Sequence, residues 1–540
     1  MGIPSYYKRL IDTVPGLVSK GHPSANIEWL FMDFNCLIYH CLHREDTPPY
    51  PGITNNDDWE AQFLECIVKY TLKVIKEVNP KKGVFIGVDG VVPMAKMRQQ
   101  RLRRFKSIWL TQHPECDENY KSSTSDNIPT WDRNSITPGT TFMTKLRIRL
   151  ELMISKHGKK TWLLSSSDEP GEGEHKIISE WRKGTYDGNF AVYGLDADLI
   201  ILTMLGREQC HLENNVWLFR EEVNAGKIAY NSEGEEQFEW FSINELTNWL
   251  SSEFRLSIRQ RVFILNYCFA MSILGNDFLP GSLGLKIRED GHSELLDIIQ
   301  THTANNLTLI DPDSLQISLK DVKILFTILS TTEESRIQKY IHKKQMIARN
   351  CTSSDQIIKI GDNNWPLSHV EENILVNGKH LIPTWKGKYI THFFNGFGFN
   401  NDIHRICKDY MYGIQWIWAY YSGSFEKVCF NWFYSFNLPP LFIWLKDYLN
   451  DIGMPDFPEK VLIRACDIRP VEQLVLVLPL ESWSLIPPCV EKELPRLAPQ
   501  FYPSMFSFES TGKRYFWECE SMIPLPSILE IKEIIRLSPT

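Results

Sequence analysis

Four short apolar runs, each closed by an acid or a turn, constrain this chain more than any other feature of its sequence. The runs are rich in β-branched and aromatic residues and cover Trp29 to Phe34, Gly83 to Val88, Thr161 to Ser165 and Phe190 to Leu202. Amphipathic segments of helical length, such as Trp59 to Val78 and Thr141 to Lys156, lie between them. Buried strands that alternate with helices predict an α/β domain with a mostly parallel central sheet flanked by helices.

Changes in composition divide the 540 residues into three predicted parts. Residues 1–300 form the α/β domain, in which the polar stretch from His113 to Ile136 is a long loop. Residues 301–374 are a polar connecting region with a helical run from Val322 to Lys344. Residues 375–540 are rich in aromatic rings, especially from Tyr412 to Leu445, and rings at that density are most often core. We expect this last part to be mainly helical and to pack against the first.

Composition excludes several classes of protein. No run of 18 uncharged apolar residues is present, and the N-terminus has no signal pattern, so we expect a cytoplasmic or nuclear monomer without membrane contact. The 12 cysteines form no Cys-x-x-Cys pair, which argues against a zinc ribbon or a thioredoxin-like site. The formal net charge of −8 does not announce a nucleic-acid-binding protein, although an average can hide a local basic patch.

Acidic residues stand at the carboxyl ends of the predicted strands, where open parallel sheets bind ligands. Asp33 and Asp89 follow the first two strands, and a pair of glutamates follows the third in a loop whose glycines allow sharp turns. Two aspartates lie two residues apart on the fourth run, and on an extended chain both would point to the same side. Another aspartate follows the apolar helix Val262 to Leu274. The full set is Asp33, Asp89, Glu172, Glu174, Asp196, Asp198 and Asp277.

Seven carboxylates at one sheet edge would repel one another unless cations neutralise them. Oxygen ligands without accompanying histidines or cysteines favour Mg²⁺ or Mn²⁺ over zinc, and seven acids are enough for two ions about 4 Å apart. Such a pair of ions supports hydrolysis of a phosphodiester. Each acid alone has an ordinary structural explanation as a turn residue or a helix-terminal charge, but these explanations do not account for five acid-bearing turns at one edge.

A basic helix is predicted from Val92 to Leu110. Four of its side chains, at spacings i, i+4, i+7 and i+8, share an arc of about 100°. They are Lys96, Gln100, Arg103 and Arg104. Two guanidinium groups with an ammonium and an amide make a good anion cage, which could hold a terminal phosphate near the proposed metals. In isolation a basic stripe is more often a solvated face.

Ordered motifs along most of the chain resemble the Xrn-type 5′-to-3′ exoribonucleases. In the first part these are Met1 to Tyr7, Asp33 to Asn35, Asp89-Gly90 with Lys96 to Phe105, Ile136 to Thr140, Glu172 to Lys176, Gly194 to Asp198 and Gly275 to Phe278. In the second they are Trp385-Lys386, Tyr412 to Gly423, Trp432 to Pro440, Pro470 to Leu474 and Gly512 to Glu518. The same seven acids match the family's metal ligands, and the same four residues of the basic helix match its 5′-phosphate pocket.

The resemblance implies a nuclease core related to flap endonucleases (PIN-like) that binds two Mg²⁺ or Mn²⁺ ions. It also implies stepwise release of nucleoside monophosphates from single-stranded RNA with a 5′ monophosphate, with decapping machinery as a partner. Tyr39 stands where the family has a base-stacking histidine, and Trp432 matches a base-stacking tryptophan. This substitution by tyrosine bears more on translocation and processivity along the RNA than on the cleavage reaction itself. The chain stops where the family's core stops, so we expect a core-only member, from a virus or a divergent eukaryote.

Three other functions remain open at this point. A structure-specific DNA flap endonuclease would share the chemistry, but the second aromatic region argues against it. A catalytically inactive RNA-end binder or scaffold would not need all seven acids. A small-molecule phosphatase with Asp196 as nucleophile would carry its Asp-x-Asp pair on the first strand instead.

Overall fold

The computed structural model describes most of the chain. Its described residues are 5–52, 56–113, 130–158, 160–194, 196–224, 227–351, 358–394, 401–456, 463–486, 490 and 498–537. Most of the predicted loop from His113 to Ile136, namely residues 114–129, lies outside them. Within them, no helix is both long enough and apolar enough to cross a membrane.

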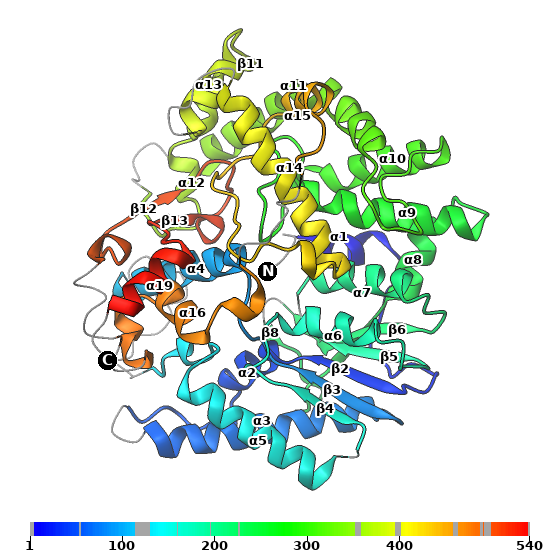
Figure 1. Ribbon diagram of the computed structural model, residues 1–540, viewed down its shortest axis with the longest axis vertical. Coiled ribbons are helices and arrows are strands. Elements are labelled where there is room, and N and C mark those ends of the chain that lie inside the picture. Colours follow the sequence, from blue (N-terminus) through cyan, green and yellow to red (C-terminus); the bar gives the residue numbers. More distant parts are fainter. Residues whose placement is uncertain are drawn as a thin grey trace.

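A seven-stranded sheet with the order β1-β9-β6-β5-β2-β3-β4 forms the centre of the first part (Figure 1). Five neighbouring strands are parallel: β6 (Val216–Glu221), β5 (Phe190–Tyr193), β2 (Trp29–Asp33), β3 (Gly83–Gly87) and β4 (Trp162–Ser165). β9 (Phe238–Ser242) and β1 (Val18–Ser19) add an antiparallel edge. The mostly parallel sheet predicted from the sequence is confirmed.

The fourth predicted strand is wrong beyond Tyr193. β5 ends there, and the rest of the apolar run forms α7 (Asp198–Gln209). Residues 198–206 of this helix are all buried, so it has no polar face and its sequence shows no helical period. Asp196 therefore lies in a loop and Asp198 opens a helix, and the argument that both share one side of an extended chain does not hold.

Helices cover both faces of the sheet because alternate residues of each strand point in opposite directions. Leu30 and Met32 of β2 pack with α2 (Phe34–Leu42), α3 (Asn56–Val78) and α5 (Thr141–His157). Phe31, between them, faces α6 (Gly173–Trp181) and the core that contains α7, α8 (Ile243–Ser251) and α9 (Ser257–Ala270). In Figure 1, α3 and α5 lie below the strands and α6 and α7 above them.

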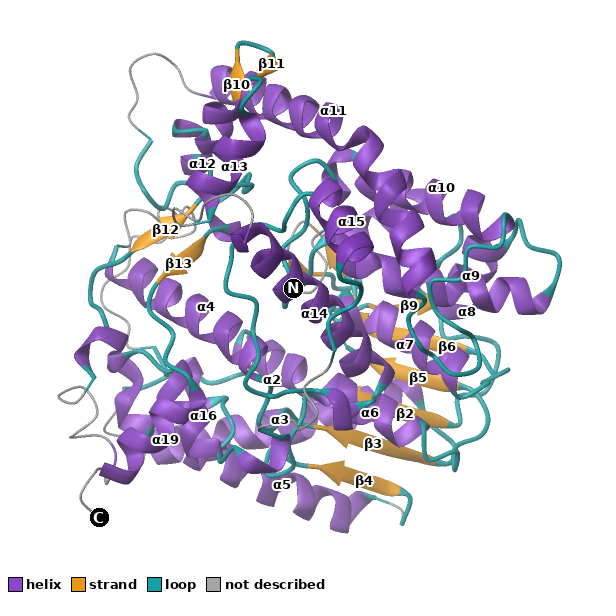
Figure 2. Cartoon of the chain, turned by 45° about the horizontal axis from the view of Figure 1, so that its top comes forward, coloured by secondary structure: helices purple, strands orange, loops and turns teal. Residues whose placement is uncertain are grey.

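The remainder of the chain is mainly helical, as predicted, and its helices lie above and to the left of the large sheet in Figure 2. Its elements are α10 (Gly291–Ala304), α11 (Leu319–Cys351), α12 (Trp365–Ser368), α13 (Trp385–Phe393), α14 (Asn401–Ser422), α15 (Phe442–Asp451), α16 (Pro470–Val477) and α19 (Ile528–Leu537), with the hairpins β10 (Val376–Asn377) to β11 (His380–Leu381) and β12 (Ser507–Glu509) to β13 (Glu520–Met522). The helical run predicted at Val322 to Lys344 lies inside α11.

One hydrophobic core joins the two conserved parts. It includes Tyr6 in α1 (Tyr6–Thr13), Ile200 in α7 and Trp416 in α14, each fully buried. The aromatic stretch after residue 412 thus supplies core, as its density indicated. The boundaries 1–300, 301–374 and 375–540 stay predictions, because this core crosses them.

The predicted basic helix is α4 (Met94–Gln112), which packs against α16 and β13. On its inner side Arg101 is fully buried and donates hydrogen bonds to the carbonyls of Leu476 (2.7 Å), Pro524 (3.2 Å) and Phe501. Each acceptor belongs to the last 70 residues. The orientation of α4 therefore depends on the C-terminal elements, which lie beside it in Figure 1.

Candidate active site

The carboxyl ends of three parallel strands place three of the seven predicted acids. Asp33 is the last residue of β2, Asp89 follows β3, and Asp196 follows β5. Glu172 immediately precedes α6, and Glu174 lies in its first turn. Asp198 is the first residue of α7, and Asp277 follows the short 3-10 helix Met271–Leu274 that continues α9.

These acids converge on one cavity of about 480 Å³. Six of the seven line it: Asp33, Asp89, Glu172, Glu174, Asp196 and Asp277. Asp198 is not among the lining residues, because its side chain lies buried behind them, next to Asp277. Its Oδ1 has no hydrogen-bond partner among the described residues. The structure thus gathers the predicted acids at one edge of the sheet.

The crowding of these carboxylates raises several of their pKa values. Burial and the charge of Asp89 hold the pKa of Asp33 well above its usual value. Burial and Glu172 do the same to the pKa of Glu174, and burial and Asp277 raise the pKa of Asp198 to about 7. In each case loss of water and like-charge repulsion disfavour the ionised form. Burial also acts on Asp277, but Lys96 outweighs it and lowers the pKa of that carboxyl.

Lys96 is the one cationic side chain that contacts the acids directly within the described part of the cavity. Its Nζ lies 2.6 Å from Glu172 Oε2 and 2.9 Å from Asp277 Oδ2. These two carboxylates outweigh burial and raise the pKa of Lys96 well above its usual value. Lys96 was predicted to belong to the phosphate cage; in the structure it stands between the acids and the rest of that cage.

Glu172, Glu174 and His175 each offer a ligand atom within 4.8 Å of the other two. His175 is buried, its ring centroid lies 3.9 Å from that of Tyr420, and its Nε2 has no hydrogen-bond partner in the described structure. Burial lowers its pKa well below the usual value, so the imidazole is neutral. Sequence reasoning passed over His175. Its position directly after Glu174 was the available signal.

Gly173, between the two glutamates, is required by close backbone packing. A Cβ at this position would meet Asp33 Oδ1 at 2.5 Å and the carbonyl oxygen of Gly87 at 2.7 Å. Its backbone N–H donates to Asp89 Oδ1 at 2.7 Å. The preceding Gly171 has φ of 108°, a conformation that favours glycine. The two glycines therefore let α6 begin directly against the ends of β2 and β3.

The predicted anion cage lies on the same cavity. Lys96, Gln100, Arg103 and Arg104 all line it, as does Tyr39. Arg104 is only 9% exposed, and its Nη1 has no partner among the described residues. Burial lowers its pKa to about 10, which leaves the guanidinium charged at neutral pH. A buried, unsatisfied cation that faces a cavity is a strong anion-binding group.

Trp432 does not line this cavity with the other predicted residues. Its indole Nε1–H donates to Asp409 Oδ1 at 3.0 Å, and its ring centroid lies 5.6 Å from that of Tyr412 and 5.3 Å from that of Trp416. The ring is half-buried and also packs on Gly413. Stacking of RNA bases between Tyr39 and Trp432 stays a prediction.

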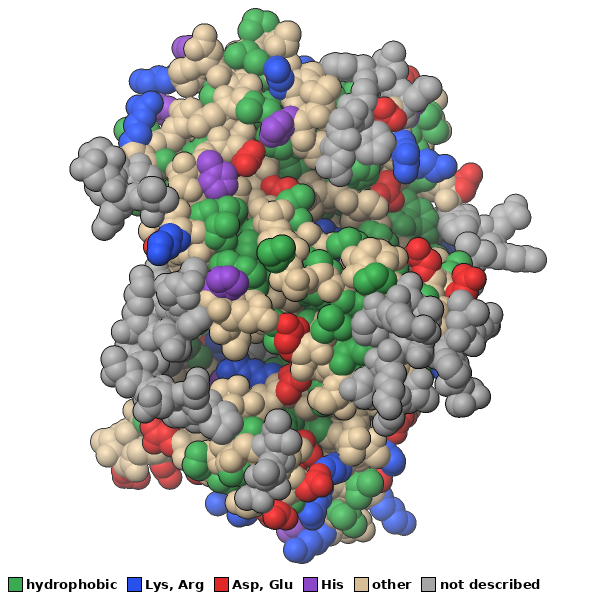
Figure 3. Space-filling model, turned by 90° about the vertical axis from the view of Figure 1, so that its left-hand side faces the viewer, with side chains coloured by type: hydrophobic (Ala, Val, Ile, Leu, Met, Phe, Trp, Pro, Cys, Tyr) green, Lys and Arg blue, Asp and Glu red, His purple; other side chains and the backbone are tan. Residues whose placement is uncertain are grey.

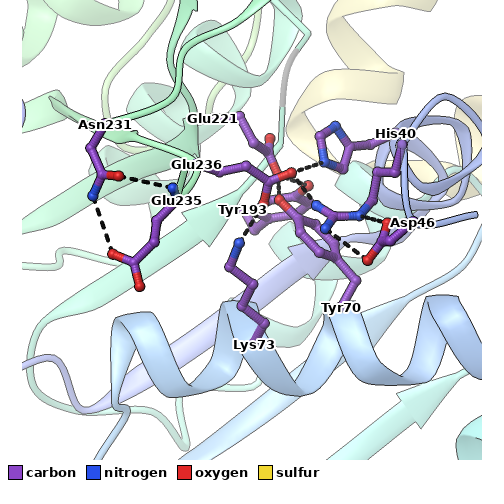
Figure 4. Close-up of polar contacts among 10 residues, drawn as sticks. His40, Asp46, Tyr70, Lys73, Tyr193, Glu221, Asn231, Glu235 and Glu236 are labelled. Atoms are coloured by element: carbon purple, nitrogen blue, oxygen red, sulfur yellow. Dashed lines mark hydrogen bonds and ion pairs between the residues drawn. The ribbon is translucent and has the colours of Figure 1, made fainter. Parts of the chain in front are cut away.

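A further wall of the cavity was not predicted. His40 and Arg44 from the end of α2 line it together with Ile228 of β8 (Lys227–Ile228) and Tyr230. Figure 4 shows that Glu236 holds this wall in place. Its buried carboxylate accepts from His40 (3.3 Å), from Lys73 (2.6 Å) and from Arg44. The contact joins residues almost 200 positions apart, which no local sequence pattern reveals.

Replacing Glu236 with glutamine should destabilise the fold by about 3 kcal/mol at pH 7, because it leaves Arg44 and Lys73 without their buried counter-charge. Burial raises the pKa of Glu236, but His40, Lys73 and Arg44 outweigh it and lower the pKa to about 2. The contribution of the carboxylate is thus present at neutral pH and is lost as pH falls from about 4.5 towards 2. Urea unfolding at several pH values measures it.

The neighbouring Glu235→Gln variant is the matched control, since Glu235 is exposed and its side chain bonds only to Asn231 in Figure 4. It should unfold like the wild type at every pH. An equal effect of the two substitutions, or a Glu236→Gln deficit that persists at pH 2, would contradict the assignment.

Two family models match this chain. One, described as the XRN 5'-3' exonuclease N-terminus, covers residues 1–222, and the other, described as the Xrn1 helical domain, covers residues 379–533. The first range contains six of the seven predicted acids and the whole basic helix. The second contains the aromatic helix α14 and the segments that hold Arg101.

Similar curated proteins include "5'-3' exoribonuclease 1" of Homo sapiens, 27% identical over 97% of this chain and 33% of that protein. The "5'-3' exoribonuclease 1" of Schizosaccharomyces pombe is 25% identical over 97% of this chain and 47% of that protein. The "5'-3' exoribonuclease 2" of Arabidopsis thaliana is 24% identical over 97% of this chain and 66% of that protein. The chain thus spans a third to a half of the length of the first two.

Proposed function

Because this chain belongs to the Xrn family of 5′-3′ exonucleases, we propose that it is a metal-dependent 5′-to-3′ exoribonuclease. Its substrate is single-stranded RNA with a 5′ monophosphate, and its products are nucleoside monophosphates. One observation carries the finer part of this proposal. The buried guanidinium of Arg104, whose Nη1 has no partner among the described residues, and a crowded cluster of carboxylates face the same cavity.

The acid cluster fits a pair of Mg²⁺ or Mn²⁺ ions. The donors are carboxylate oxygens, and the orphaned buried atoms Asp198 Oδ1 and His175 Nε2 lie beside them. Asp33, Asp89, Glu172, Glu174, Asp196, Asp198 and Asp277 would hold the ions. Bound there, two such ions activate water and stabilise the charge that develops on the scissile phosphate.

The residues of the chain supply binding, position and direction. Gln100, Arg103 and Arg104 hold the 5′ phosphate, and this contact sets which linkage reaches the acids. Lys96 lines the cavity with both the acids and the other cage residues, so its ammonium can turn from the acids to a phosphate of the bound RNA. Tyr39 offers a ring to the first base. A cage sized for one phosphate excludes a cap or a triphosphate. Lys and Arg side chains gather in a recess on the face shown in Figure 3, so a local basic region coexists with the acidic average.

The test uses RNAs of one sequence with a 5′ monophosphate, a 5′ hydroxyl or a 5′ triphosphate, each with Mg²⁺ or with EDTA. We expect rapid release of mononucleotides only from the monophosphate RNA with Mg²⁺, and about 100-fold slower release from the other two, as expected for the loss of charge-assisted contacts to one phosphate. Equal degradation of all three would refute the end pocket.

Circular RNA is the control for end dependence. An enzyme that requires a 5′ end leaves it intact, whereas a flap-type endonuclease cuts circular RNA or DNA. Binding of monophosphate RNA without any release of mononucleotides would instead support the inactive scaffold.

A further inference from the structure

A second cavity of about 490 Å³ adjoins the catalytic one. Its wall is built by α4, the loop after residue 274, α11 and the connection between β12 and β13. Gln99, Arg103 and Asp277 line both cavities. The exposed side chain of Arg103 thus borders both cavities. The volume is in the range of small-molecule sites.

Two ammonium groups in this wall are satisfied by carbonyl oxygens alone. Lys106 Nζ donates to the carbonyls of Phe516 (2.5 Å) and Cys519 (2.9 Å), and Lys286 Nζ donates to the carbonyl of Gly512. Neither forms an ion pair with a carboxylate in the described part of the chain. Burial lowers the pKa of each to about 8, so both are charged at neutral pH and gain from an anion.

The acids of the same wall are already paired. Glu518 Oε1 lies 2.5 Å from Arg288, and Glu520 Oε2 lies 3.1 Å from Arg98. Glu520 also lies 3.6 Å from Lys513, the third lysine that lines the cavity. These carboxylates therefore form no direct ion pair with Lys106 or Lys286 in the described structure, although they lie close enough to act on both charges. The cavity as a whole favours an anion.

Aromatic side chains complete the wall. Tyr434, Phe436 and Trp517 line the cavity, and Trp517 is 50% exposed, stacked on Tyr515 with Arg288 5.2 Å from its ring centroid. Rings of this kind bind nucleobases by stacking. An anion site beside the half-exposed ring of Trp517 has the chemistry of a nucleotide site.

We propose that this second cavity receives the nucleoside 5′-monophosphate that the catalytic cavity releases. The inference rests on the proposed exonuclease function. After cleavage the leading phosphate at Arg103 belongs to the released nucleotide and no longer to the RNA chain, and Arg103 stands at the boundary of the two cavities. Lys106 and Lys286 would take over that phosphate, with the base against the aromatic wall.

The test is calorimetric titration of adenosine 5′-monophosphate into the full chain in EDTA, together with a 5′-monophosphorylated RNA oligonucleotide as the second ligand. We expect Lys286→Gln to weaken binding of the monophosphate about tenfold, the effect of one charge-assisted contact, while affinity for the RNA changes less than twofold. Lys513→Gln, a milder change at a partly exposed residue, should weaken monophosphate binding two- to threefold. Lys339→Gln, an exposed lysine of α11, is the control and should bind like the wild type.

Unchanged monophosphate affinity in both the Lys286 and Lys513 variants overturns the inference, and so does an equal loss for monophosphate and RNA, which would place the RNA chain in this cavity. Either result leaves the proposed exonuclease standing if only monophosphate RNA is degraded. If degradation ignores the 5′ end, the proposed function fails, whatever the calorimeter shows.

Discussion

An Asp33→Asn protein is expected to release mononucleotides about a thousandfold more slowly than the wild type, yet to unfold at a higher temperature in EDTA. Asp33 lies at the centre of the acid cluster, where burial and Asp89 raise its pKa well above the usual value. A metal site contributes several kcal/mol of transition-state stabilisation, and a loss of about 4 kcal/mol corresponds to about 10³-fold in rate.

The gain in stability follows from linkage. The folded protein binds the Asp33 proton more tightly than the unfolded chain does, so ionised Asp33 costs stability as pH rises above its unfolded pKa. Asparagine removes that cost at neutral pH. We expect the unfolding temperature to rise by about 2 °C, and the rise to disappear when Mg²⁺ stabilises the wild type.

Rates of release from monophosphate RNA and thermal unfolding with and without Mg²⁺ measure the two effects. Asp168→Asn is the matched control: it removes the same charge from the loop before α6, where Asp168 is exposed and pairs with Arg147 at 2.9 Å. An Asp33→Asn protein that keeps a tenth of the wild-type rate would show that this carboxylate holds no ion needed for catalysis.

An Arg104→Gln protein should lose the preference for monophosphate RNA over 5′-hydroxyl RNA, from about 100-fold to less than about fivefold. Its buried guanidinium has no partner for Nη1 within the described structure and would make a charge-assisted contact with the phosphate, worth about 1.5–3 kcal/mol. Cleavage of hydroxyl RNA should change little, because that substrate never makes the contact.

The ratio of the two rates isolates this effect from damage to the acid cluster, which would slow both substrates alike. Arg147→Gln, which removes a partly exposed guanidinium paired with Glu151 and Asp168, is the control and should keep the wild-type ratio. If Arg104→Gln keeps the full preference, the phosphate is held elsewhere and the assignment of the cage is wrong.

Local sequence patterns predicted the elements that carry the site, because each of these elements has a recognisable pattern within a few residues. Asp33 ends an apolar strand, Glu172 follows a strand and precedes a helix, and the face of α4 repeats with a helical period. The carboxyl ends of parallel strands meet at one edge of the sheet, so acids at several strand ends were enough to predict that they lie close together. The apolar run after Tyr193 was wrongly predicted to continue the strand, because a fully buried helix and a buried strand have similar sequences.

Contacts between distant segments could not be predicted. Glu236 reaches His40, and Lys286 reaches the carbonyl of Gly512, across about 200 residues in each case. Strands β6 and β9 were also missed. Lys96 was assigned by its helical spacing, but the contacts of its ammonium depend on acids from two other segments, Glu172 and Asp277.

The three carbonyls that bind Arg101 determine which fragments of this chain can fold. They come from separate stretches near the C-terminus, while the opposite side of the same helix presents the cage to the cavity. A fragment that ends after β9, in the large sheet, would keep six of the seven acids but would leave a buried cation exposed and its helix unanchored. We therefore expect the part with the large sheet and the helical part to fold only together, so that neither can be produced as a separate domain.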